Sequence, residues 1–237
     1  NKMINKNYPV KISIKNIFTL SIPIFFSNLA LPLVGVVDTG LMGNLGETKY
    51  LAAISIATSV LTMVIWSFGF LRMGTVGIIA QLYGKGEYKE IIRTVLRNFL
   101  IAITIALIII LCKPIIISLI NFFFLTSDRT QDLINTYISV RIFSIPAELT
   151  IYILIGFYLG LQKTKISSLL IITLSILNIF FSSFLVLSIN LDVFGAALGT
   201  LIASYLTVII FSIYTYFFIV KKFKIIPKFQ KIIVKSK

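Results

Sequence analysis

Four ionisable side chains lie inside long apolar segments of the sequence: Asp38, Arg72, Arg141 and Glu148. The most isolated is Asp38, in PLVGVVDTGLMGNLG (residues 32–46), because residues 17–46 hold no other ionisable side chain. A carboxylate taken out of water favours its neutral form, so Asp38 could exchange a proton or coordinate a cation. The alternative is structural: Asp38 could be a static ion-pair partner of Arg72 or Arg141.

Arg141 and Glu148 are seven residues apart, and Ser144 and Tyr152 fall on the same helical face. Seven residues of helix rise by about 10 Å, which long side chains or a bridging water can span. We therefore expect Arg141 and Glu148 to form a polar network with a structural role. Arg72 is a further candidate member of this network.

Two later segments carry regularly spaced small or polar residues. Ser175, Asn178 and Ser182 share one helical face, which usually serves interhelical hydrogen bonding and, where several such faces meet, lines a cavity. Thr200 lies beside a stripe of small residues at every fourth position: Gly195, Gly199, Ala203 and Thr207. Close helix packing is the first interpretation of this stripe.

The composition is that of an integral membrane protein. Of the 237 residues, 58% are hydrophobic and 13% charged, and the mean hydropathy is +1.01. Several apolar runs reach the ~20 residues that a spanning helix needs, so we expect an all-α membrane protein. Six spans are predicted: residues 17–42, 49–82, 89–112, 132–160, 166–189 and 193–220. A short interfacial or re-entrant piece should follow Lys113, and Pro146 should kink the fourth span.

The basic residues assign an orientation to these spans. With six spans, 17 of the 22 Lys and Arg residues fall on the side of both termini and three on the other side. Because cytoplasmic loops are enriched in Lys and Arg, both termini are predicted to be cytoplasmic. The expected organisation is a basic cytoplasmic N-terminus (1–16), a six-helix transmembrane lobe (17–220) and a basic cytoplasmic tail or inter-lobe linker (221–237).

Several classes of function are disfavoured by the residue types. The sequence has no His and a single Cys, Cys112, so neither a disulfide framework nor a usual zinc site can form. Common intramembrane hydrolase schemes also need groups that are missing, so we expect no enzyme, no cofactor and no metal. The basic residues lie at helix ends rather than on a soluble face, so nucleic acid is not an expected partner.

Five stretches resemble the multidrug and toxic compound extrusion (MATE) transporters, specifically the DinF branch: Asp38 with Thr39, WSFGFLRMGTVGIIAQLYGKG (66–86), YISVRIFSIPAE (137–148), GFYLGLQKTK (156–165) and LNIFFSSFLVLSINLDVFGAALGT (177–200). The resemblance implies one lobe of a fold with twelve helices in two six-helix lobes. This chain resembles the amino-terminal lobe, so the carboxy-terminal lobe is a missing partner.

The resemblance also implies a cation-coupling site. In the family, this lobe carries an Asp on the first helix, an Asn and an Asp on the fifth, and a Thr on the sixth. These positions correspond to Asp38, Asn178, Ser182 and Thr200 here, with Ser182 in place of the second carboxylate. The proposed site therefore has one negative charge fewer than the family's site. This loss disfavours tight Na⁺ binding and favours H⁺ exchange at Asp38.

The expected function is that of the amino-terminal lobe of an H⁺- or Na⁺-coupled multidrug efflux antiporter in the cell (inner) membrane, incomplete alone. Its partners would be membrane lipid and an amphipathic organic substrate. Two alternatives stay open: half of a lipid-linked oligosaccharide flippase, or a non-transporting membrane fragment of a split or decaying gene.

The orientation can be tested with topology reporters. Fusions after Lys163 and after Lys237 should report the cytoplasm, and a fusion after Arg129 should report the outside, because of the distribution of Lys and Arg. Paired alkaline phosphatase and green fluorescent protein fusions measure both outcomes. An external signal at Lys237 would contradict the six-span topology.

Overall fold

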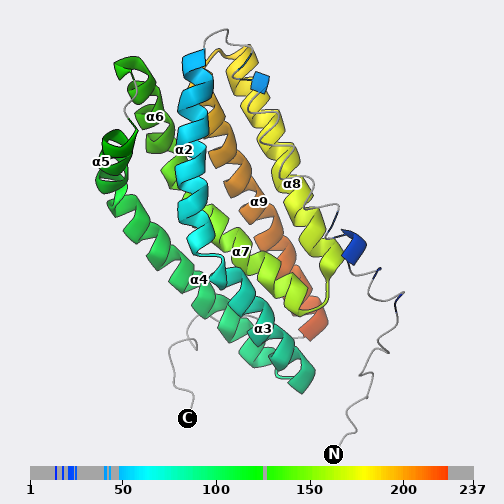
Figure 1. Ribbon diagram of the computed structural model, residues 1–237. Helices are drawn as coiled ribbons and strands as arrows, with labels where there is room; N and C mark the ends of the chain where they lie inside the picture. Colours follow the sequence, from blue (N-terminus) through cyan, green and yellow to red (C-terminus); the bar gives the residue numbers. More distant parts are fainter. Residues whose placement is uncertain are drawn as a thin grey trace, which may run out of the picture.

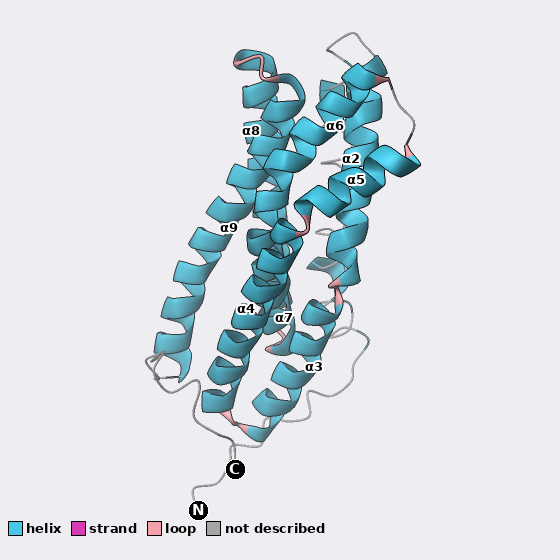
Figure 2. Cartoon of the chain, turned by 90° about the vertical axis from the view of Figure 1, so that its left-hand side faces the viewer, coloured by secondary structure: helices cyan, strands magenta, loops and turns pink. Residues whose placement is uncertain are grey.

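The computed structural model describes residues 48–124 and 127–223 and, near the amino terminus, residues 14, 18, 21–23, 25, 40, 41 and 43. All regular elements in this part of the chain are helical, and they form an elongated bundle (Figures 1 and 2). Five helical stretches are long and apolar enough to cross a membrane: Thr48–Lys85, Tyr88–Leu111, Asp128–Gly160, Thr164–Ser188 and Asp192–Lys221. They coincide with five predicted spans, whereas the first predicted span, residues 17–42, lies almost wholly outside the described residues.

The bundle is built from the following elements in chain order: α2 (Thr48–Ser67), α3 (Phe70–Lys85), α4 (Tyr88–Leu111), α5 (Lys113–Phe123), α6 (Asp128–Arg141), the 3-10 helix η1 (Ile142–Ser144), α7 (Ile145–Gly160), α8 (Thr164–Ser183), the π-helix η2 (Phe184–Ser188) and α9 (Asp192–Phe223). Helix α5 has 11 residues, about 16 Å of rise, which is too short to cross a membrane. It lies at an angle to the long helices (Figure 2), at the place where the sequence predicts a short piece.

The fourth span is interrupted just before Pro146, where the sequence predicts a kink. Between α6 and α7 the three residues of η1 wind more tightly, and Pro146 occupies the first turn of α7. Proline lacks the N–H that would continue the α-helical ladder, which explains the break. The hydroxyl of Tyr205 on α9 donates a 3.0 Å hydrogen bond to the carbonyl of Phe143 in η1. A neighbouring helix therefore supplies a donor to the broken segment.

The second predicted span contains a break that the sequence analysis did not anticipate. Helix α2 ends at Ser67 and α3 begins at Phe70. The Gly69 N–H donates to the Trp66 carbonyl at 2.8 Å, which is the three-residue spacing of a 3-10 turn. Glycine is a poor helix former, and its presence at position 69 explains where the helix changes from α2 to α3.

Two helix pairs approach so closely that a side chain larger than hydrogen does not fit. Between α8 and α9, a Cβ on Gly199 would lie 2.6 Å from the Ser182 backbone N and 2.7 Å from its Cα. Between α3 and α7, a Cβ on Gly156 would lie 2.7 Å from Thr75 Cβ. The prediction that small residues of the last span serve helix packing is confirmed at Gly199.

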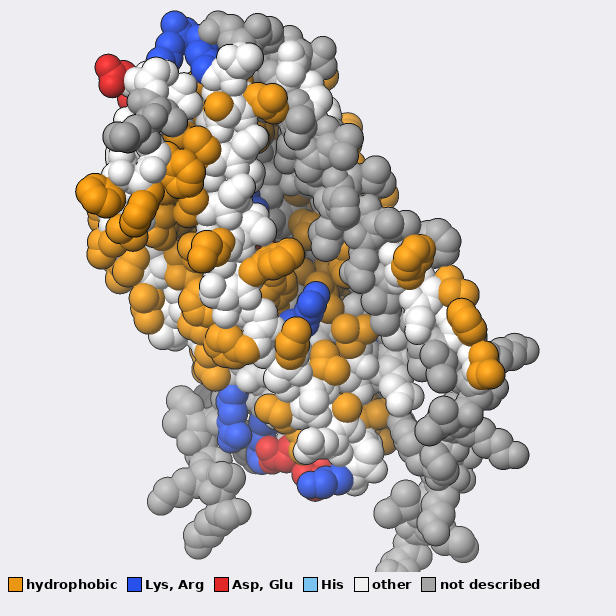
Figure 3. All heavy atoms as spheres, in the orientation of Figure 1, with side chains coloured by type: hydrophobic (Ala, Val, Ile, Leu, Met, Phe, Trp, Pro, Cys, Tyr) orange, Lys and Arg blue, Asp and Glu red, His pale blue; other side chains and the backbone are white. Residues whose placement is uncertain are grey.

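The outer surface of the bundle is apolar along its middle. Figure 3 shows hydrophobic side chains over the middle of the visible face and acidic side chains toward its two ends. Large apolar residues are exposed on several helices, among them Met63, Leu111, Phe122 and Phe217. This surface suits hydrocarbon, in which only structures with internally satisfied backbone groups are stable.

Replacing Gly199 with alanine should lower the unfolding temperature of the chain in detergent, because the new methyl group meets the backbone of Ser182. Overpacking of this kind costs about 1–3 kcal/mol. The matched control is Gly77→Ala on α3, where nothing lies within 4 Å of the new Cβ. Circular dichroism melting compares the two variants, and a Gly199→Ala chain as stable as wild type would contradict the close contact.

Candidate functional site

Three of the four residues expected to form a cation site are described by the structure. Asn178 and Ser182 lie on α8 and Thr200 lies on α9, whereas Asp38 lies outside the described residues. The three described residues meet where α8 and α9 are in closest contact, at Gly199. The candidate site is therefore built on two helices whose spacing is fixed by their backbones.

A direct hydrogen bond joins the two helices at this point. The side-chain amide of Asn178 donates through Nδ2 to Thr200 Oγ1 at 2.8 Å. The Thr200 hydroxyl in turn donates to the carbonyl of Ala196 at 3.1 Å. Asn178 is buried, so this chain of bonds orients its amide group with the carbonyl oxygen Oδ1 left free to accept.

Two buried oxygens beside this bond have no hydrogen-bond partner within the described part of the chain: Asn178 Oδ1 and Ser182 Oγ. Residues four apart stand one turn above each other on a helix, so both side chains face the same side of α8. A buried polar atom without a partner costs about 1–3 kcal/mol, so two such atoms on one helix face make this contact a candidate site for a ligand. Oxygen atoms of this kind can coordinate a hard cation or accept a proton from a carboxyl group.

The helix geometry changes immediately after Ser182. The π-helix η2 begins at Phe184, and the carbonyl of Leu185 would lie 3.1 Å from a Cβ on Gly195. Single π-turns insert an extra residue into a helix and are frequent near functional sites. The π-helix thus begins two residues after Ser182 and six residues after Asn178.

A second polar cluster bridges the break between α6 and α7. Arg141 donates through Nη1 to Ser144 Oγ and to Glu148 Oε1. Ser144 Oγ also lies 2.8 Å from Glu148 Oε1 and 2.6 Å from the carbonyl of Arg141. The Arg141 and Glu148 side chains are only 14% and 15% exposed. The structure thus brings together two of the three residues singled out as a polar network, across the helix break.

Arg72 lies apart from this ion pair. Its guanidinium carbon is 5.8 Å from the centroid of the Tyr152 ring, which places the cation over an aromatic face. Tyr152 follows Glu148 by one turn of α7, so its ring lies between Glu148 on its own helix and Arg72 on α3. Arg72 therefore neighbours the network through Tyr152, without an ion pair to any carboxylate in the described ranges.

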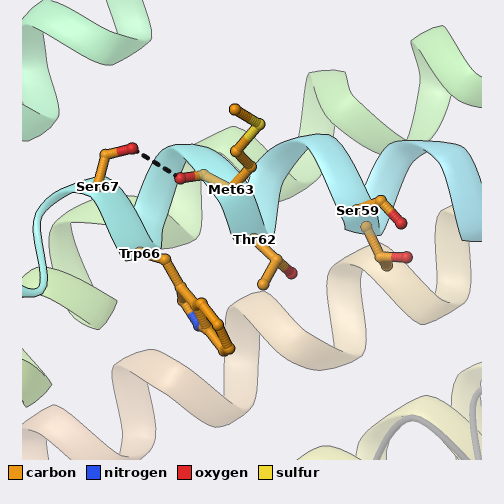
Figure 4. Close-up of a pocket in the computed structure, with 6 residues that line it drawn as sticks. Ser59, Thr62, Met63, Trp66 and Ser67 are labelled. Atoms are coloured by element: carbon orange, nitrogen blue, oxygen red, sulfur yellow. Dashed lines mark hydrogen bonds between the residues drawn. The ribbon is translucent and has the colours of Figure 1, made fainter.

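An open pocket of about 710 Å³ along α2 was not anticipated from the sequence; its lining is Thr58, Ser59, Thr62, Met63, Trp66 and Ser67. Figure 4 shows Trp66 and Thr62 on one side of the helix and the Ser67 hydroxyl bonded back to the Met63 carbonyl, at 2.9 Å. The sequence feature that could have indicated this pocket is the repeat of hydroxyl residues along the helix, at Thr58, Ser59, Thr62 and Ser67. Ser59 likewise bonds its own helix, at 2.7 Å from the Ser55 carbonyl, so few polar groups converge on the pocket.

Within the described residues no group of three or more His, Cys, Asp or Glu side chains could hold a metal ion. The two polar groupings that include sequence-predicted site residues are the α8–α9 contact and the α6–α7 break. Both are small sets of oxygen and nitrogen atoms inside an apolar bundle. Such sets suit binding and proton exchange.

Comparison with known proteins identifies the family. A sequence profile of the MatE family matches residues 23–184. The chain belongs to the MATE transporter family. It is 33% identical over 196 residues to the DNA damage-inducible protein F of Escherichia coli (strain K12), which covers 83% of this chain and 43% of that protein. The resemblance to the DinF branch is thereby confirmed, and membership of a transporter family agrees with the prediction that the chain is no enzyme.

Two further comparisons show what share of longer proteins the chain matches. The multidrug export protein MepA of Staphylococcus saprophyticus is 24% identical over 202 residues, covering 84% of this chain and 44% of MepA. A solved structure of an outward-facing multidrug resistance MATE family transporter superposes with a TM-score of 0.82 at 20% identity, covering 93% of this chain and 48% of that one. The chain spans about half the length of the relatives it matches, and its bundle matches half of a MATE transporter.

Replacing Glu148 with glutamine should destabilise the chain by about 3 kcal/mol, because Arg141 then keeps a largely buried charge without its counterion. The control is Glu90→Gln on α4, since the Glu90–Arg93 pair is more exposed, at 36% and 38%. Exposed pairs contribute about 0–1 kcal/mol. Unfolding by sodium dodecyl sulfate in mixed micelles measures both variants, and equal losses would show that Arg141 is well solvated.

Proposed function

We propose that this chain is the amino-terminal lobe of a cation-coupled multidrug efflux antiporter, with the coupling site formed by Asp38, Asn178, Ser182 and Thr200. The observation that carries the proposal is the pair of buried, unpartnered oxygens of Asn178 and Ser182 beside the Asn178–Thr200 hydrogen bond. Within a membrane protein such oxygens need a proton donor or a cation. Asp38 can supply the first or help to bind the second.

The set of ligands favours H⁺ over Na⁺ as the coupling ion. Asn178 and Ser182 contribute neutral oxygens, so Asp38 is the single carboxylate of the proposed site. A hard cation is held best by several oxygens that include enough negative charge to offset its dehydration. A proton needs only one carboxyl group and an acceptor for its hydrogen bond, which Asn178 Oδ1 and Ser182 Oγ provide.

Transport in this proposal requires a second lobe. The relatives that the chain matches are about twice as long, and transporters built from repeats bind substrate between the two halves and expose it alternately to each side. The cargo would be an amphipathic organic molecule that enters between the lobes. Loading of the coupling site would change the relative stability of the outward-open and inward-open arrangements.

Several structural features would allow the lobe to respond to ion binding. The break at η1 and the π-helix η2 interrupt two of the spans at defined residues. Interrupted spans bend at such points with little loss of packing elsewhere. Since η2 begins two residues after Ser182, a change in how Ser182 is bound would act next to a segment that already departs from α-helical geometry.

Cation binding can be tested on the full chain in lipid nanodiscs through its unfolding temperature. A ligand that binds only the native state raises stability by RT ln(1 + [L]/Kd), about 2.7 kcal/mol at a hundredfold excess over Kd. The unfolding temperature should respond to H⁺ between pH 8 and pH 5.5, or to Na⁺ replacing choline. Asp38→Asn and Asn178→Ala should lose this response, because each removes a proposed ligand.

The matched control for this experiment is Ser168→Ala. Ser168 lies on the same helix, is also buried with an unpartnered hydroxyl in the described part of the chain, and is about 15 Å from Asn178 along α8. It should keep the full response to the coupling ion. An unchanged response in Asn178→Ala, or no response of the wild-type chain to either cation, would remove the basis of the proposed coupling site.

A further inference from the structure

The two arginines inside the membrane spans differ in how their charges are compensated. Arg141 forms an ion pair with Glu148 and a hydrogen bond with Ser144. Arg72 makes one contact of note, with the face of the Tyr152 ring at 5.8 Å. Across residues 48–124 and 127–223 no carboxylate is ion-paired with Arg72. The second arginine therefore carries a charge that the described residues do not neutralise.

An aromatic face offsets only part of what an arginine loses inside a membrane. The guanidinium stays protonated at any physiological pH and carries five N–H donors. Contact with a ring attracts the positive charge but accepts none of these N–H groups in a conventional hydrogen bond. Since uncompensated cations are strongly disfavoured at membrane depth, Arg72 requires a partner other than the described residues, either water or an anion.

The neighbouring carboxylate is already engaged. Glu148 lies one turn from Tyr152 on α7 and exerts an electrostatic influence on it, as Arg72 does from α3. However, Glu148 accepts hydrogen bonds from Arg141 and lies 2.8 Å from Ser144 Oγ. The cluster of Arg72, Arg141 and Glu148 thus has one positive charge in excess, and this excess is located at Arg72.

Arg72 lies within a membrane-spanning stretch and is partly accessible from outside the bundle. It is half-buried and follows the α2–α3 break by only a few residues, so it lies well inside the 38-residue stretch Thr48–Lys85. Figure 3 shows a basic side chain midway along one face of the molecule, with apolar side chains around it. A polar group with an attached apolar chain would find both kinds of surface on such a face.

We propose that Arg72, positioned by Tyr152, binds the negatively charged group of an amphipathic molecule, a carboxylate or a phosphate. This inference rests on the proposed transport function and narrows its substrate class to anionic or zwitterionic amphiphiles. The guanidinium fork matches two oxygens of either group, and the surrounding apolar side chains take the hydrocarbon part. Arg141 is less suited to this role because Glu148 already neutralises its charge and its Nη1 donates to Ser144 and Glu148.

The chain contains a built-in reporter for this binding. Trp66 is its single tryptophan, is 74% exposed and precedes Arg72 by six residues, a separation of at most about 22 Å. A dansyl group accepts energy from tryptophan over such distances. The probe is 11-(dansylamino)undecanoic acid, compared with the same dansyl chain ending in a trimethylammonium group. Both are titrated into the full chain in phosphatidylcholine nanodiscs.

The wild-type chain should bind the carboxylate probe saturably and more tightly than its cationic analogue. Arg72→Gln should weaken binding of the carboxylate probe at least tenfold, the change expected when a charge-assisted pair is lost. Arg72→Lys, which keeps the charge but not the fork, should fall between the two. The matched control is Arg97→Gln at an exposed position of α4, which should bind as wild type does.

Two results would overturn the inference: equal affinity of Arg72→Gln and wild type, or tighter binding of the cationic probe by wild type. The second comparison needs no variant, so it decides even if Arg72→Gln fails to fold. Asp38→Asn should keep probe binding, which separates this inference from the coupling site. Competition by added phosphatidylglycerol would identify a lipid headgroup as the natural source of the anion, and absence of competition would identify a free amphiphile.

Discussion

The interior of a membrane offers no water to a polar group, and this constraint shapes the whole bundle. Backbone groups are satisfied within helices, and hydroxyls such as Ser59, Ser67 and Thr207 bond the carbonyl one turn before them. Arg141 and Glu148 neutralise each other across a helix break. Against this background the exceptions are informative. Within the described residues six buried oxygens have no hydrogen-bond partner, Asn178 Oδ1 and Ser182 Oγ among them, and the guanidinium of Arg72 has no ion pair there.

The two helix breaks differ in what compensates them. At η1, the ion pair of Arg141 with Glu148 joins the two sides, and Tyr205 donates to the carbonyl of Phe143. At the α2–α3 junction, short backbone bonds around Gly69 replace the α-helical ladder. The first break is therefore held by long-range contacts, whereas the second depends on local backbone geometry. The α2–α3 junction should therefore change its bend more easily than the break at η1, because fewer groups must move together.

The fold could be predicted from the sequence to a large extent, because a run of about 20 apolar residues specifies a spanning helix almost without regard to its neighbours. Pro146 predicted the break at η1, because proline removes a backbone hydrogen-bond donor from the helix. Gly69 gave a weaker signal, since glycine is common within membrane helices and interrupts them only in some contexts.

The candidate site was harder to predict from the sequence than the fold. A regular spacing showed that Asn178 and Ser182 share a face, and the family resemblance related them to Thr200, but neither indicates which atoms lack partners. That property depends on how α8 and α9 meet. The same is true of Arg72, whose difference from Arg141 exists only in three dimensions.

The contact through Gly199 has a consequence for the spacing of α8 and α9. Because backbone lies against backbone there, no rotamer change can widen or narrow the gap between the two helices. A ligand bound beside Asn178, Ser182 and Thr200 would therefore meet two helices whose separation at Gly199 is set by backbone atoms rather than by side-chain rotamers.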